Sequence, residues 1–78
     1  GLVYYKVRNY KKALVDYTKA ISLLDSFGDY YCNRGLVYFE LKEYDEALKD
    51  YNKAISLDDK HVLYWQNRGN VYHDLEDY

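Results

Sequence analysis

The sequence predicts an all-α fold, an α-solenoid of antiparallel helix hairpins, on the basis of three observations. The chain resembles itself at a spacing of 34 residues, apolar residues within each period fall at helical spacing, and large and small residues are placed symmetrically about one point. A period of about 20 to 50 residues is typical of repeat proteins, in which each unit buries its apolar face against its neighbours.

The repeat is clearest when residues 1–27 are aligned with residues 35–61, because 15 of the 27 positions are identical without a gap. The recurring residues are Gly1, Gly35 and Gly69; Tyr4, Tyr38 and Tyr72; Tyr10, Tyr44 and Tyr78; Ala13 and Ala47; Tyr17 and Tyr51; and Ala20 and Ala54. The chain therefore divides into an incomplete first repeat at 1–27, a complete repeat at 28–61 and an incomplete third repeat at 62–78, about two and a half repeats in all.

Each period contains two stretches with helical spacing. Tyr31, Gly35 and Tyr38 are four and three residues apart, and the spacing of Leu48, Tyr51 and Ile55 is three and four, so each set lies on one face of a helix. The pattern predicts five helices, near residues 1–8, 11–24, 29–42, 45–58 and 62–75.

The two helices of a unit are expected to meet as a hairpin that turns just after Leu41. Three pairs of residues are equidistant from Leu41: Tyr31 and Tyr51, Gly35 and Ala47, and Tyr38 and Tyr44. In such a hairpin Gly35 would face Ala47, which lets the two backbones approach closely. The predicted structural core comprises Gly35, Gly69, Ala47, Ala54, Tyr38, Tyr51, Tyr72 and Trp65.

Composition argues against several classes of function. The formal net charge is −2, with mixed signs and no basic stripe, so nucleic acid is not an expected partner. The apolar runs are only a few residues long, so no membrane association is expected. Cys32 is the single cysteine, which excludes an internal disulfide and suggests a reducing compartment such as the cytoplasm.

No constellation for catalysis or metal binding is found. The candidate ligands Cys32, His61 and His73 are not paired at helical spacing, so we expect no metal site, no cofactor and no cysteine nucleophile. The glycines are about 34 residues apart and lie in predicted helices, so they form no phosphate-binding loop. The chain is therefore not expected to be an enzyme.

The string Tyr-Tyr-Cys-Asn-Arg-Gly-Leu-Val-Tyr at 30–38 carries a family resemblance, together with the residues that follow it: Leu41, Tyr44, Ala47, Leu48, Tyr51, Ala54 and Ile55. These spacings resemble the tetratricopeptide repeat, and residues 65–72 restate them. The proline common after the second helix is replaced by Asp25 and Asp59. The resemblance implies a piece of a longer array that binds protein partners.

Two asparagines, Asn33 and Asn67, occupy equivalent mid-helix positions although asparagine is a mediocre helix former. The resemblance implies that the first helix of each unit lines a concave groove. There, similar asparagines in the repeats of O-linked N-acetylglucosamine transferase hold peptide backbone. A carboxamide can donate and accept at once, which suits a main chain. The implied peptide-binding groove is Asn33, Asn67, Leu36, Phe39, Asn70 and His73; alternatively the two asparagines are simply solvated.

The carboxylate clamp, with which some relatives bind acidic chaperone tails, does not transfer. Its lysine positions read Cys32 and Leu63, its first asparagine positions Leu2 and Leu36, and its arginine position Asn67; only Asn33 fits. The sequence therefore argues against chaperone carboxylate-tail binding. Two alternatives to peptide binding stay open, namely self-association through uncapped ends and service as the substrate-recruiting array of a larger enzyme.

Overall fold

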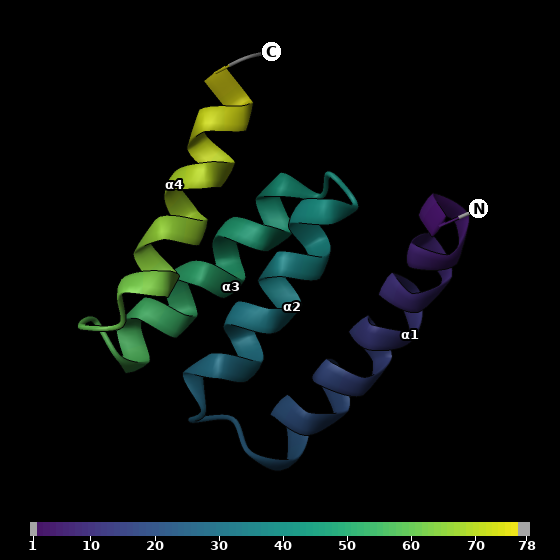
Figure 1. The fold of residues 1–78 in the computed structure, drawn as a ribbon. Coiled ribbons are helices and arrows are strands. Elements are labelled where there is room, and N and C mark those ends of the chain that lie inside the picture. The colour runs from purple at the N-terminus through teal and green to yellow at the C-terminus, as the bar shows by residue number, and fades with distance from the viewer. Residues whose placement is uncertain (1, 77–78) are drawn as a thin grey trace.

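The computed structural model describes residues 2–76, with side chains from residue 9 onward, and these residues form four α-helices (Figure 1). The helices are α1 (Leu2–Leu23), α2 (Gly28–Glu40), α3 (Tyr44–Leu57) and α4 (Val62–Glu76). The chain folds back at each connection, so that α1 packs against α2, α2 against α3, and α3 against α4, with a smaller contact between α2 and α4. The all-α prediction is confirmed, whereas the count of five helices is wrong.

The hairpin between α2 and α3 turns after Leu41, where the sequence placed it. The N–H of Glu43 donates to the C=O of Tyr38 at 2.8 Å and the N–H of Lys42 to the C=O of Phe39 at 3.0 Å. These two bonds form a Schellman motif, in which Lys42 adopts the left-handed conformation with φ 63°. That conformation costs a non-glycine residue roughly 1–2 kcal/mol, so packing of α2 on α3 must offset it.

The first unit does not turn, because α1 runs without a break through the predicted connection at residues 9 and 10. Arg8 is the equivalent of Lys42, and a turn there would require the same unfavourable backbone conformation. Only seven residues precede Arg8, so a separate helix would offer about two turns of packing surface, while a continuous helix keeps its main-chain hydrogen bonds. Gly1 and Tyr78, which belong to the sequence repeat, lie outside the described residues.

The core lies between α2 and α3 and continues onto α4. Ala47, Tyr51 and Ala54 have no exposed surface and Gly35 is buried, while Tyr38 packs against this cluster from its edge. A Cβ added to Gly35 would lie 2.8 Å from Cε1 of Tyr51. The close approach is therefore to Tyr51, and the predicted pairing of Gly35 with Ala47 needs correction. Side chains lean toward the N-terminus of their helix, which carries the Tyr51 ring over the level of Ala47.

Three other residues expected in the core are exposed. Trp65 is 45% exposed and Tyr72 49%, and an added Cβ on Gly69 would meet no atom within 4 Å. The equivalent residues of the complete repeat are covered by α3, so that Tyr31, for example, is only 8% exposed. Within residues 2–76 no helix covers the corresponding side of α4, which explains the difference.

Side-chain contacts repeat with the same period as the sequence. Tyr31 Oη donates to the C=O of Asp25 at 2.9 Å, and Trp65 Nε1 donates to the C=O of Asp59 at 2.8 Å. The same holds for the ring pairs Phe27–Tyr30 and His61–Tyr64, and for the hydroxyl bonds Ser22 to Lys19 and Ser56 to Lys53. Units that differ in completeness therefore share one local geometry.

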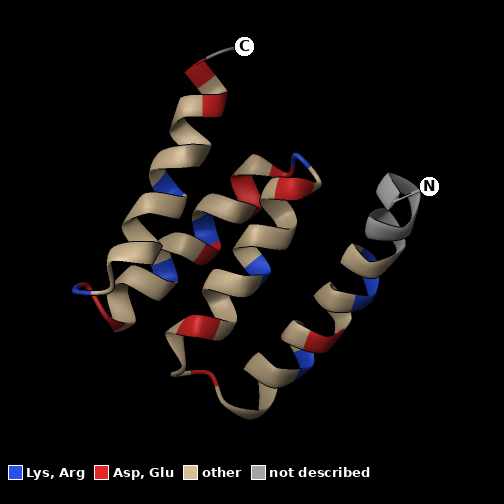
Figure 2. Cartoon of the chain, viewed as in Figure 1, with Lys and Arg blue, Asp and Glu red and all other residues tan. Residues whose placement is uncertain are grey.

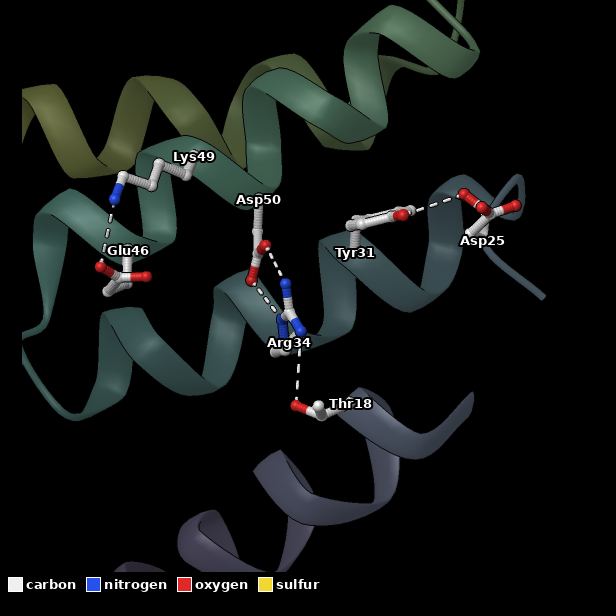
Figure 3. A network of polar contacts seen from close by, with 7 residues as sticks. All are labelled: Thr18, Asp25, Tyr31, Arg34, Glu46, Lys49 and Asp50. Atoms are coloured by element: carbon white, nitrogen blue, oxygen red, sulfur yellow. Dashed lines mark hydrogen bonds and ion pairs between the residues drawn. The ribbon is translucent and has the colours of Figure 1, made fainter. Parts of the chain in front are cut away.

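A charged network links three helices (Figure 3). Arg34 on α2 makes two 2.8 Å bonds to the carboxylate of Asp50 on α3, and its Nη1 lies 3.3 Å from Oγ1 of Thr18 on α1. The side chain of Asp50 is only 5% exposed, so this is a bidentate and largely buried ion pair. The sequence suggested a recurring arginine–aspartate pair; in the described chain Arg68 instead bonds Asn52 Oδ1 at 2.8 Å.

Candidate interaction surface

The first helices of two successive units, α2 and α4, lie side by side and run parallel. Near their starts Tyr64 Oη donates to Oδ1 of Asp29 at 2.5 Å, and one turn later Asn67 Nδ2 lies 3.3 Å from Sγ of Cys32. Both contacts join residues 35 apart, which fixes the register of the two helices. Burial, and then the bond to Asp29, raises the pKa of Tyr64, so the phenol stays neutral and remains a donor.

Two matching stripes of side chains follow these helices, at steps of four, three and four residues. We call them together the α2–α4 face: Asp29, Asn33, Leu36 and Glu40 on α2, and Leu63, Asn67, Asn70 and Asp74 on α4. Asn67 and Asp74 are half-buried and the other six are exposed. Leu36 and Leu63 are 43% and 49% exposed, so each stripe presents one large apolar side chain between polar ones.

The predicted groove residues fall into two groups. Asn33, Leu36, Asn70 and His73 are exposed. Phe39 packs against the core and its ring lies 5.9 Å from that of Tyr44, so part of its surface is already used within the fold. Asn67 uses its amide nitrogen on Cys32 and keeps its carboxamide oxygen outside any hydrogen bond found for the described residues.

The α2–α4 face is acidic. It carries three carboxylates and no lysine or arginine, and the single arginines of α2 and α4 are directed toward the second helices of the units (Figure 2). Glu40 and Asp74 accept from the equivalent hydroxyls of Tyr10 and Tyr44, at 3.5 Å and 3.3 Å. The nearest further cation is conditional, since Nε2 of His61 lies 3.7 Å from Asp29 and is charged only when protonated.

Cys32 is 4% exposed at the base of this face. Burial raises the pKa of its thiol above the ordinary value, although the contact with Asn67 acts in the opposite direction. A thiol of this kind holds little thiolate at neutral pH. Residues 2–76 contain no cluster of three or more histidine, cysteine, aspartate or glutamate side chains placed to hold a metal ion.

Sequence reasoning missed the residue that anchors α4. Tyr64 is 3% exposed and holds α4 to the start of α2, and Val71 and Val37 are also buried. A Cβ on Gly28 would lie 2.8 Å from the hydroxyl of Tyr64, so this contact is as tight as the one at Gly35. The available signal was the 34-residue spacing between Tyr30 and Tyr64, which marked both positions as part of the repeat.

None of the helices in the described part of the chain combines the length and the apolar character that crossing a membrane requires. Residues 28–61 match the family model described as tetratricopeptide repeat. No curated protein sequence matches the chain.

Solved structures resemble the whole arrangement. The TPR domain of Arabidopsis OM64 is 36% identical with a TM-score of 0.85, over 95% of this chain and 61% of that one. The second TPR of Spaghetti (RPAP3), bound to the HSP90 peptide SRMEEVD, is 29% identical with a TM-score of 0.82, over 87% of this chain and 63% of that one. The chain thus spans somewhat under two thirds of either structure.

The peptide in the second structure bears on one expectation. A protein with this fold holds an HSP90 peptide, which is at odds with the sequence-based argument against chaperone-tail binding. That argument rested on five clamp positions and did not test the fold. The period, the antiparallel hairpin, the match at residues 28–61 and the two structural likenesses agree, and the chain belongs to the tetratricopeptide repeat family.

Proposed function

We propose that this chain is a protein-binding module that holds an extended segment of a partner along the α2–α4 face, and that it does not catalyse a reaction. The observation that carries the proposal is the pair of matching, exposed stripes on two parallel helices. Their leucines are large and exposed, and their asparagines occupy mid-helix positions where they contribute little to helix stability.

Asn33 and Asn67 are proposed to bind the main chain of the partner. Neighbouring packed helices lie about 8–10 Å apart, and an extended peptide advances about 3.3 Å per residue, so the two carboxamides would meet the ligand about three residues apart. Asn67 can offer its oxygen to a peptide N–H while its nitrogen stays on Cys32, whereas Asn33 can both donate and accept. Leu36 and Leu63 would contact side chains of the ligand.

Two such contacts support only weak binding. Each is worth on the order of 0.5–1.5 kcal/mol net, so we expect dissociation constants no better than the high-micromolar range for this chain alone. The charge of the face sets a second preference. Three carboxylates without a free lysine or arginine favour neutral or basic ligands, and an acidic ligand has only carboxamide and main-chain donors available there.

The test uses defined peptides and NMR. The 15N-labelled chain is titrated with SRMEEVD, with the same peptide carrying lysine at its three acidic positions, and with binders selected from a random peptide library. Amide shifts should change along α2 and α4, and the lysine peptide should bind more tightly than SRMEEVD. If SRMEEVD binds more tightly, the assignment of partner charge is wrong.

The role of the asparagines is tested separately. Asn33→Ala with Asn67→Ala should weaken every selected peptide by a similar factor, about fivefold or more, without lowering the melting temperature. Ser22→Ala with Ser56→Ala is a matched control, because these equivalent serines bond only their own helices. Unchanged affinity of the asparagine double variant would contradict the proposed main-chain contacts.

The remaining alternative, recruitment of substrates to an attached enzyme, would use the same face and needs residues outside this chain. Shift mapping is the same for both, so the present experiments test the binding step that they share.

A further inference from the structure

A second surface lies on the opposite side of α4, and its counterpart is found on α1. Residues 10–23 of α1 are the structural equivalent of α3, because they make the same contacts to the helix that follows. Thr18 contacts Arg34 as Asn52 contacts Arg68, and Tyr10 bonds Glu40 as Tyr44 bonds Asp74. Each pair of contacts is related by the 34-residue period.

On its other side, α3 covers the preceding helix. The Tyr51 ring lies against Gly35, and Asp50 takes the guanidinium of Arg34. The equivalent residues of α1 are Asp16 and Tyr17. Asp16 is exposed and Tyr17 is half-exposed, and no described helix lies against this side of α1.

The complementary side of α4 is equally open. Its residues Trp65, Arg68, Gly69 and Tyr72 are equivalent to residues of α2 that α3 covers. Arg68 lies 4.7 Å above the ring of Trp65 and has no carboxylate partner among the described residues. The α2 counterpart shows that both contacts are compatible, since Arg34 stays within 5.9 Å of the Tyr31 ring while it binds Asp50.

We propose that a second copy of this chain covers α4 with its own α1, in the position that α3 takes on α2. In this arrangement Asp16 of one copy pairs with Arg68 of the other, and the ring of Tyr17 lies on Gly69. The opposite charges of Asp16 and Arg68 complement each other, and the tyrosine fills the space that Gly69 leaves open. Residues 2–9 of α1 precede the equivalent of the start of α3, so they lie beyond the end of α4.

This contact joins two different surfaces, and therefore it is heterologous and does not close after two copies. Association should continue head to tail, with each added copy extending the solenoid in the register of its own repeats. By helical spacing the contact surface is opposite to the α2–α4 face, so the inference is independent of the proposed peptide binding.

Sedimentation velocity of the chain over a range of concentrations provides the first test. The average sedimentation coefficient should rise continuously with concentration without a plateau at the dimer. Gly69→Ala should abolish this rise, because the added methyl group meets the incoming Tyr17, while the monomer keeps its helicity. Asn70→Ala, on the neighbouring residue, should associate like the parent.

Charge reversal tests the register. Asp16→Arg and Arg68→Asp should each weaken association by about tenfold or more, because each places like charges together. A mixture of the two variants should associate again, because opposite charges then meet wherever a copy of one variant stacks on a copy of the other. A chain that stays monomeric at all concentrations overturns the proposal, as does association that Gly69→Ala leaves intact or that the mixture fails to restore.

Discussion

The two repeat glycines of α2 and α4 allow one substitution to be compared in a covered and an open position. At Gly35 an added Cβ would lie 2.8 Å and 3.0 Å from two ring carbons of Tyr51 and 3.2 Å from Cβ of Asp50. Tyr51 has no exposed surface and Asp50 is held by Arg34, so neither neighbour can move freely. At Gly69 nothing lies within 4 Å of the added atom.

Gly69→Ala should therefore show the helix propensity of alanine alone, a gain of about 0.5–1 kcal/mol. Gly35→Ala obtains the same gain but loses about 1–3 kcal/mol to overpacking, which leaves a net loss of about 0.5–2 kcal/mol. For a domain of this size 1 kcal/mol corresponds to roughly 4–8 °C in Tm, so the two variants should shift the melting temperature in opposite directions.

Circular dichroism melts and urea titrations measure both variants, at concentrations where sedimentation shows monomers. Gly35→Leu enlarges the effect, and Leu36→Ala is its control, because that side chain is 43% exposed and its loss should cost little. The reasoning fails if Gly35→Ala and Gly69→Ala stabilise the chain equally, since Gly35 would then not be covered by Tyr51.

The other predictions concern buried groups. Tyr51→Phe should raise the free energy of unfolding by about 1 kcal/mol, because the buried Tyr51 hydroxyl has no hydrogen-bond partner among the described residues, whereas Tyr31→Phe should lower it by a similar amount through the loss of a main-chain bond. Burial raises the pKa of Tyr51, so stability should be constant below pH 10, fall above it, and fall less in Tyr51→Phe; urea titrations at each pH measure this. Asp50→Ala should cost about 2–4 kcal/mol and the equivalent Asp16→Ala less than about 0.5 kcal/mol, by urea titration; equal losses would contradict the buried pair. Cys32, buried with a raised pKa, should react with iodoacetamide at pH 8 far more slowly than in urea, and a rate equal to that of the unfolded chain would contradict its burial.

The fold could be predicted from the sequence because the period, the helical spacing and the turn after Leu41 are all local patterns. The break between the first two expected helices could not. Arg8 and Lys42 are equivalent and chemically similar, yet only Lys42 adopts a positive φ. The difference depends on how much helix precedes the turn and on the packing that it would gain, which no local pattern encodes.

The interaction surface was predicted as a set of equivalent positions and not as a set of environments. Asn33 and Asn67 are identical by sequence, but Asn67 lies against Cys32 because a preceding unit is present there. Trp65 and Tyr31 are equivalent, but only Tyr31 is covered, because α3 follows α2. In a repeat protein the position comes from the unit itself, and burial comes from the neighbouring unit.

The two sides of α4 are coupled if both proposals hold. A copy that stacks on α4 would bring its own α2 alongside, as α4 lies alongside α2 within the chain, and the α2–α4 face would continue across the junction. A peptide long enough to span that junction would gain contacts only in the stacked state. By thermodynamic linkage such a peptide must promote association, and association must raise its affinity by the same factor. Gly69→Ala would then weaken binding of long peptides while leaving short ones unaffected, although the residue faces away from the peptide.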